Sequence, residues 1–147
     1  MVNLPEYVSK KEVRRVCKEL GLKDWTGIKK QVVMEKEASI ILKAVNQTKM
    51  KIPLKEFKQG LEVELEHGTM YTDANVTNNH PILTGKIVLA HLKETMDYYE
   101  RLEVVEIEGE LLKAVLSRDL SKIEAKYKKL IAARELLLKA IKEQLPK

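Results

Sequence analysis

Two short patterns of Glu and His are the parts of this sequence best suited to chemistry. Glu64 and His67 lie three positions apart, and so do His91 and Glu94. Residues three apart on a helix share a face, so each pair presents one imidazole beside one carboxylate. If two such helices pack antiparallel, the four side chains converge into a ligand set for zinc, iron or manganese. Tyr98, one turn after Glu94, is then expected to donate a hydrogen bond to that carboxylate.

The same residues also fit an interpretation without a metal. Glu64 and His67 share a helical stripe with Phe57 and Leu61. Polar groups on such a buried face need partners, so facing His and Glu side chains can form hydrogen-bonded ion pairs by themselves. A carboxylate and histidine metalloenzyme is a third interpretation. No separate acid, base or substrate pocket is visible, however, so the sequence does not favour an enzyme.

The elements that must position these residues are predicted to be helices. Gly and Pro together number 10, too few for an all-β chain with many tight turns. Apolar residues recur at helical spacing, which predicts an all-α bundle of five or six helices. The helices are expected from Lys10 to Gly21, from about Thr26 to Val45, from Pro53 to His67 before Gly68, from Thr84 to Ile107 before Gly109, and over 110–143 with a break near Asp119. The Asn-rich segment 69–81 is expected to be an ordered loop.

The last segment carries a heptad pattern. Ile131 and Leu138 widen its apolar face beyond a simple two-stranded seam. We therefore expect it to be buried in the bundle or against a second chain, by self-association or with a protein partner. The seam residues alternate in steps of three and four: Ile123, Tyr127, Leu130, Arg134, Leu137 and Ile141.

Charge is distributed in blocks along the chain. Residues 1–58 hold 14 Lys/Arg against 7 Asp/Glu, residues 59–110 hold 3 against 11, and residues 111–147 hold 10 against 4. The acidic centre favours a cation, whereas the basic flanks favour an anionic partner such as nucleic acid. Phosphate contacts are expected from the polar face of the first helix: Lys10, Lys11, Arg14 and Arg15. The alternative is that this face is simply solvated.

Composition limits the class of protein. No apolar run approaches the ~20 residues that span a bilayer, so no membrane is expected. The N-terminus shows no signal peptide, and a single Cys excludes an internal disulfide. These features predict a cytoplasmic protein. We expect one domain over 1–147, with basic helices in 1–50, an acidic hairpin in 53–108 and a basic helical segment in 110–147.

Several motifs in the centre resemble a known family. They include Glu66-His67-Gly68, the 75–79 segment, Gly85-Lys86-Ile87 and the His91 to Glu94 step. Over about residues 55–108 the chain resembles small uncharacterised proteins, a domain of unknown function from bacteria, archaea and their viruses. His80 departs from that pattern, because an acidic residue is expected before the proline. The family has no assigned reaction, so the resemblance implies a shared local structure and leaves a viral origin open.

Two functional hypotheses follow. The first is a small helical protein with a central Glu/His cluster that acts mainly through protein or nucleoprotein contacts. The second is a viral structural or regulatory protein without a metal, which binds a capsid, DNA or a polymerase. It would reside in the virion or the host cytoplasm.

Overall fold

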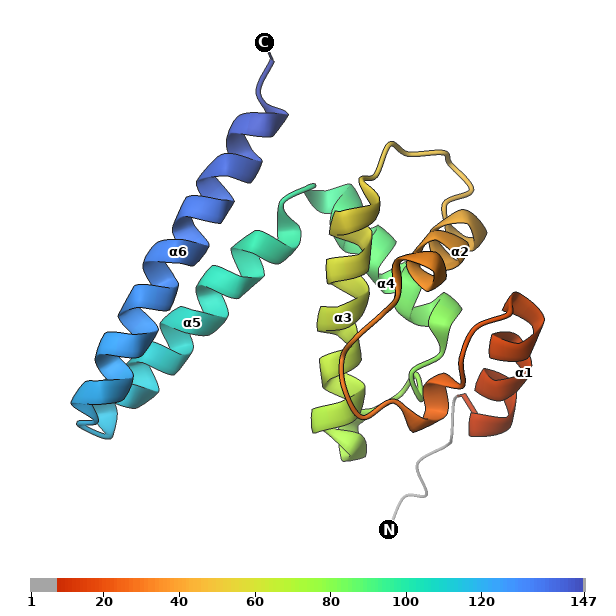
Figure 1. The fold of residues 1–147 in the computed structure, drawn as a ribbon, viewed down its shortest axis with the longest axis horizontal. Coiled ribbons are helices and arrows are strands. Elements are labelled where there is room, and N and C mark those ends of the chain that lie inside the picture. The colour runs from red at the N-terminus through yellow and green to blue at the C-terminus, as the bar shows by residue number, and fades with distance from the viewer. Residues whose placement is uncertain (1–7, 147) are drawn as a thin grey trace. The chain divides into compact units, whose positions relative to one another are not determined.

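The computed structural model describes residues 8–146, and all regular structure in that range is helical (Figure 1). The predicted all-α class is therefore confirmed. None of the described helices is both long and apolar enough to cross a membrane. In chain order the elements are α1 (Lys10–Leu20), η1 (Trp25–Gly27), α2 (Glu35–Val45), α3 (Leu54–Met70), η2 (Thr72–Ala74), α4 (Pro81–Glu94), α5 (Tyr98–Leu116) and α6 (Leu120–Gln144). They form two compact units, divided between Lys93 and Glu94, which we call the N-terminal and C-terminal units.

α1 is capped at both ends by residue types that helix ends favour. Ser9 accepts a hydrogen bond from the backbone N–H of Glu12 over 3.2 Å. Gly21 ends the helix with a left-handed φ of 66°, a conformation that costs glycine little because it has no Cβ. The helix between these caps buries Val13 and Cys17 against the core.

The second predicted helix is shorter than expected. Asp24 caps the short turn η1, accepting hydrogen bonds from the N–H and the hydroxyl of Thr26 at 2.9 and 2.7 Å. α2 begins only at Glu35. The residues between η1 and α2 include Val32 and Val33, whose β-branched side chains lose rotamer freedom in a helix.

Two glycines that were expected just after helix ends lie inside helices. α3 continues to Met70 and includes Gly68, and α5 continues to Leu116 and includes Gly109. Glycine stops a helix only where the chain needs a left-handed residue, and neither of these glycines has a positive φ.

The helix expected from Thr84 to Ile107 is in fact two helices. α4 begins at Pro81 and ends at Glu94, and α5 begins at Tyr98. No Pro or Gly marks this break in the sequence, which explains why the prediction was wrong.

The core of the N-terminal unit lies among α2, α3 and α4. A Cβ added at Gly85 of α4 would lie 2.6 Å from a methyl of Ile41 and 3.4 Å from the ring of Phe57, so the three helices pack closely there. Several large side chains in this unit are at most 1% exposed: Trp25, Ile41, Phe57, Leu61, Leu65 and Leu92.

The C-terminal unit is a hairpin of α5 and α6. Asp119 caps α6 by accepting the N–H of Lys122 over 3.1 Å, which confirms the predicted break near Asp119. The small core between the helices contains Val104 and Ile107 of α5 and Leu130 and Ala133 of α6.

The heptad seam of α6 agrees with the prediction only in part. Leu130 is buried, and Ile123 and Leu137 are half-buried. Tyr127, however, is 57% exposed. Lys126 is half-buried instead, and its ammonium pairs with Glu110 of α5. Alternate positions of the seam are thus shifted by one residue, from Tyr127 and Arg134 to Lys126 and Ala133. This shift leaves part of the apolar surface of α6 outside the hairpin core.

Candidate functional site

The structure places one Glu of the predicted cluster beside a His of the neighbouring helix. Glu64 projects from α3 and His91 from α4, and Nδ1 of His91 lies 3.0 Å from Oε1 of Glu64. The Glu64 side chain is 10% exposed and that of His91 is 25% exposed. A carboxylate this deeply buried needs compensation for lost hydration, and the imidazole supplies part of it.

His67 lies on the other side of the same carboxylate. Its Nδ1 is 3.7 Å from Oε2 of Glu64, which is within ion-pair range but too long for a hydrogen bond. The His67 side chain is 62% exposed. Glu64 is therefore held firmly by one imidazole and loosely approached by a second.

Glu94 and Tyr98 belong to the C-terminal unit. Glu94 is exposed at the end of α4, and Tyr98 begins α5 with its ring edge-on to that of Tyr99 at a centroid distance of 5.2 Å. In the part of the chain that the structure describes, no three His, Cys, Asp or Glu side chains are grouped so that they could hold a metal ion. The metal-ligand role of Glu64, His67, His91 and Glu94 stays a prediction, which metal analysis of the untagged protein would check.

Half of the basic side chains expected to bind phosphate are paired with carboxylates. Arg14 pairs with Asp24 at 3.2 Å. Arg15 pairs with Glu12 and Glu19, each at 2.6 Å, and this double pairing raises the pKa of its guanidinium. Pairing of this kind lowers the attraction of the α1 surface for nucleic acid.

The other two basic residues of this group are available for contacts. Neither Lys10 nor Lys11 forms an ion pair with any described residue, and both are exposed. A role in binding nucleic acid stays a prediction for all four positions.

The largest concentration of exposed apolar residues lies on the hairpin. Of the fifteen large hydrophobic side chains that are exposed among the described residues, ten belong to the C-terminal unit. Eight of these form what we call the apolar face: Val105, Leu112 and Val115 from α5, and Leu120, Tyr127, Ile131, Leu138 and Leu145 from α6 and its end.

An ion pair shows that both helices contribute to the same side of the hairpin. Glu108 lies between Val105 and Leu112 along α5, and Arg134 lies between Ile131 and Leu138 along α6. Nη2 of Arg134 is 2.7 Å from Oε1 of Glu108. Glu108 lies within the apolar stripe of α5 and Arg134 within that of α6, so their contact places the two stripes side by side. The apolar face is therefore one continuous surface with a neutral ion pair in its middle.

The opposite side of the hairpin is charged. Residues two positions apart on a helix lie roughly on opposite sides. A residue two positions before or after a member of the apolar face therefore points away from that face. On α5 these include Glu103, Glu106 and Glu110, and on α6 they include Lys122 and Lys129, all exposed. Leu136, which is 62% exposed, is an apolar exception on this side. The hairpin is thus amphipathic as a whole.

The sequence analysis overlooked a buried carboxylate in the N-terminal unit. Glu37 is 3% exposed and accepts hydrogen bonds from the backbone N–H of Lys23 at 3.1 Å and of Met34 at 3.4 Å, and from the indole N–H of Trp25 at 3.4 Å. This carboxylate ties the segment before α2 to the helix. The sequence could have indicated this burial, because Glu37 lies four positions before Ile41 and so shares the inward face of α2.

The comparisons with known proteins leave the chemistry of this chain open. No curated protein matches the chain, and no solved structure matches it either. A family model does match, over residues 13–108, and its description is a protein of unknown function, DUF5661. The match is wider than the stretch of about 55–108 on which the sequence resemblance rests, and it takes in most of α1 through the first half of α5. The chain belongs to the DUF5661 family.

Proposed function

We propose that this protein acts through macromolecular contacts, and that its hairpin joins a second copy of the chain in a four-helix bundle. The observation that carries the proposal is the continuous apolar face of α5 and α6. A helix in a bundle buries an apolar stripe on each side that meets a neighbour. Within the C-terminal unit each hairpin helix packs against one other helix and carries two apolar stripes, so one stripe on each is left for a partner.

The extent of the apolar face suits a dimer. Its eight side chains are between 48% and 81% exposed. At roughly 100 Å² each they offer roughly 800 Å² per copy, about the area that each partner contributes to a stable interface of standard size. Burial of that much apolar surface is strongly favourable, whereas monomers rarely expose patches so large.

The charges on the apolar face favour a second copy of the same chain. Glu108 and Arg134 together are neutral and lie near the middle of the face. In a dimer with two-fold symmetry the same patch meets itself, so a central pair in one copy can lie against the pair of the other. Each Arg134 then has a Glu108 from both copies within reach. A uniformly acidic or uniformly basic partner could not form favourable ion pairs with both Glu108 and Arg134.

The oligomeric mass of the purified full chain tests this proposal. Light scattering after size exclusion should give about twice the chain mass of 16.9 kDa at micromolar concentration. Leu138→Glu places a charge on the apolar face and should give a monomer that keeps its helical circular dichroism. Leu136→Glu is the matched control, because Leu136 is the same residue type on the same helix and is similarly exposed on the charged side. It should stay dimeric.

Three results would overturn the proposal. They are a monomeric wild-type chain, a Leu138→Glu variant that stays dimeric, and loss of the dimer in both variants alike.

A further inference from the structure

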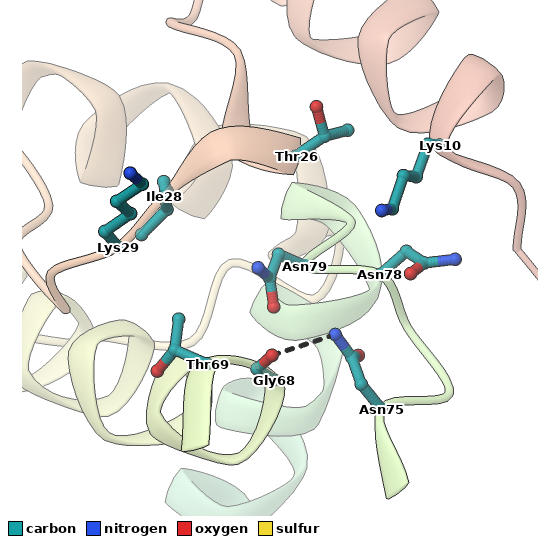
Figure 2. A pocket seen from close by; sticks show the side chains of 9 residues that line it. All are labelled: Lys10, Thr26, Ile28, Lys29, Gly68, Thr69, Asn75, Asn78 and Asn79. Carbon is teal, nitrogen blue, oxygen red and sulfur yellow. Dashed lines mark hydrogen bonds between the residues drawn. The ribbon is translucent and has the colours of Figure 1, made fainter. Parts of the chain in front are cut away.

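A polar cleft in the N-terminal unit has three walls, which four segments of the chain form (Figure 2). Its volume is about 340 Å³, within the usual range for small-molecule sites. One wall comes from the start of α1 and the residues around η1, and another from the end of α3. The third is the Asn-rich loop before α4, which the sequence analysis treated only as an ordered loop.

The loop is held firmly on both sides of the cleft. Asn75 donates a side-chain hydrogen bond to the carbonyl of Gly68 over 3.1 Å, and Asn78 donates one to the carbonyl of Val8. Asn78 and Asn79 have φ values of 47° and 60°, a left-handed conformation that asparagine tolerates better than most residues. The walls are therefore organised before any ligand arrives, which lowers the entropic cost of binding.

Gly68 lets Asn79 lie deep in the cleft. A Cβ at position 68 would be 2.0 Å from Oδ1 of Asn79 and 2.9 Å from Nδ2 of Asn75. Glycine inside a helix costs about 0.5–1 kcal/mol relative to alanine. The close approach of the asparagine side chain requires it here.

Asn79 is a buried polar side chain without a protein partner. The residue is 7% exposed, and its backbone N–H donates to the hydroxyl of Thr77 over 3.2 Å. Its side-chain amide forms no hydrogen bond with any residue that the structure describes. Figure 2 shows this side chain in the middle of the cleft, with its amide nitrogen facing the space between Lys29 and Thr69. An amide that no described residue satisfies is thus aimed at the place where a ligand would lie.

The charged groups of the cleft select an anion. Lys10 and Lys29 flank Asn79 on opposite sides in Figure 2, and no carboxylate is among the residues of 8–146 that line the cleft. Neither lysine forms an ion pair with a described residue. Lys10 is also the first residue of α1, where the helix dipole favours negative charge.

The remaining lining indicates what the anion is attached to. Thr26 and Thr69 add polar side chains to the lining, but their hydroxyls already donate within the protein, to Asp24 and to the carbonyls of Leu65 and Glu66. Ile28 is the single apolar side chain among the described lining residues. A nucleobase or another flat aromatic group would need more apolar surface than this. A phosphate offers several strong acceptor oxygens, which match two ammonium groups and the Asn79 amide. We propose that this cleft binds a small phosphate monoester with a polar body, of the sugar-phosphate or polyol-phosphate class.

Titration of the full chain with defined probes tests the proposal. Trp25 is the only tryptophan and precedes Thr26 of the cleft wall, so its fluorescence reports binding alongside calorimetry. Ribose 5-phosphate and glycerol 3-phosphate should bind saturably. Ribose and glycerol should not bind, and inorganic phosphate should bind at least several-fold more weakly than the esters.

Matched variants locate the site. Lys29→Gln and Lys10→Gln should each weaken ester binding about tenfold, since each removes a charge-assisted hydrogen bond. Lys30→Gln and Lys11→Gln remove the same charge from exposed neighbours outside the cleft and should change affinity less than about twofold. Asn79→Asp keeps the shape of the side chain but adds a negative charge, and should abolish binding while the wild-type circular dichroism and melting temperature are retained.

The proposal fails if no ester binds at millimolar concentration. It also fails if the Lys11 and Lys30 variants weaken binding as much as the Lys10 and Lys29 variants, because the attraction would then be non-specific. Equal affinity for inorganic phosphate and for the esters would mean an adventitious anion site only. None of these outcomes depends on whether the hairpin forms a dimer.

Discussion

The two units of this protein differ in how completely they bury their apolar side chains. In the N-terminal unit Trp25, Phe57 and Leu61 have no exposed surface at all. In the C-terminal unit Tyr99 is 2% exposed, and Ile107 and Leu130 between the two helices are each 4% exposed. Most of the exposed large hydrophobic residues lie on the same two helices.

The difference follows from the number of elements. The four helices and the short turn η1 of the N-terminal unit can surround a side chain on every side, whereas two helices leave each other's flanks open. The N-terminal unit buries its apolar side chains within itself, so its Asn79 cleft is lined mainly by polar groups. A hairpin that does not complete its core has a strong driving force to acquire a partner. The two proposals, small-molecule binding by one unit and assembly through the other, start from this difference.

The largest expected effect is a cavity in the complete core. Phe57→Ala removes a side chain that is 0% exposed and should lower the free energy of unfolding by about 3–5 kcal/mol. Urea denaturation followed by Trp25 fluorescence measures the change in the N-terminal unit. Val32→Ala, at a position 58% exposed in the same unit, should change it by less than about 0.5 kcal/mol. Equal effects of the two variants would contradict the burial on which the comparison rests.

Overpacking at Gly85 is expected to have the next largest effect. An alanine Cβ there would lie 2.6 Å from Ile41 and 3.3 Å from Val45, both in the packed interior. Gly85→Ala should therefore destabilise the N-terminal unit by about 1–3 kcal/mol, although alanine has the higher helix propensity. The same urea measurement checks it. A neutral or stabilising result would mean that α2 and α4 are less tightly packed than they appear here.

The pH dependence of the N-terminal unit should depend on His80. Its Nδ1 accepts the backbone N–H groups of Ile82 at 3.2 Å and of Leu83 at 3.4 Å, so the neutral imidazole caps α4. Burial lowers the pKa of His80 below its ordinary value of 6.5, and the negative charge of Glu12 offsets this only in part. The unfolded chain then binds the proton more readily than the folded one. Stability should be full above pH 6.5 and should fall as the pH drops below that value.

A non-titrating cap isolates this contribution. His80→Asn keeps a side-chain acceptor at the N-cap and should flatten the loss of stability between about pH 7 and pH 5, whereas His80→Ala should lose the cap and about 1 kcal/mol at neutral pH. His67→Gln, at an exposed position, should keep the wild-type slope. A His80→Asn variant with the wild-type slope would assign the pH dependence to other groups.

Local signals in the sequence explain which parts of the fold could be predicted. The caps Ser9, Gly21 and Asp119 act within four residues of the helix ends, so their positions follow from sequence alone. The break between α4 and α5 does not. There Asp97 is 1% exposed and is held by the Thr95 hydroxyl and by the Arg101 guanidinium at 2.8 and 3.1 Å. These contacts span only two and four residues, but the burial of the Asp97 carboxylate comes from packing, which no local pattern encodes.

The same distinction applies to the functional residues. Glu64 and His91 could be singled out because their helical spacing places each on an inward face. The cleft around Asn79 combines a left-handed loop, a glycine needed for close approach and two lysines 19 positions apart in the sequence. None of these features has a periodic signature. Sequence analysis therefore found the helical pair and missed the loop-built cleft.

The smallest expected effect is a gain of stability at Gly109. This glycine lies in the middle of α5, and a Cβ added there meets no atom within 4 Å, in contrast to Gly85. Gly109→Ala should stabilise the C-terminal unit by about 0.5–1 kcal/mol, because alanine loses less backbone entropy on forming a helix. Thermal unfolding followed by circular dichroism measures the gain, and Ala125→Gly at an exposed position of α6 should give a loss of similar size. If Gly109→Ala instead lowered the melting temperature and dissociated the dimer, a second copy would have to approach α5 at this glycine, beside the apolar face rather than across it. The changes in stability caused by Gly85→Ala and Gly109→Ala would then have the same sign, and they would no longer distinguish a closed core from an open hairpin.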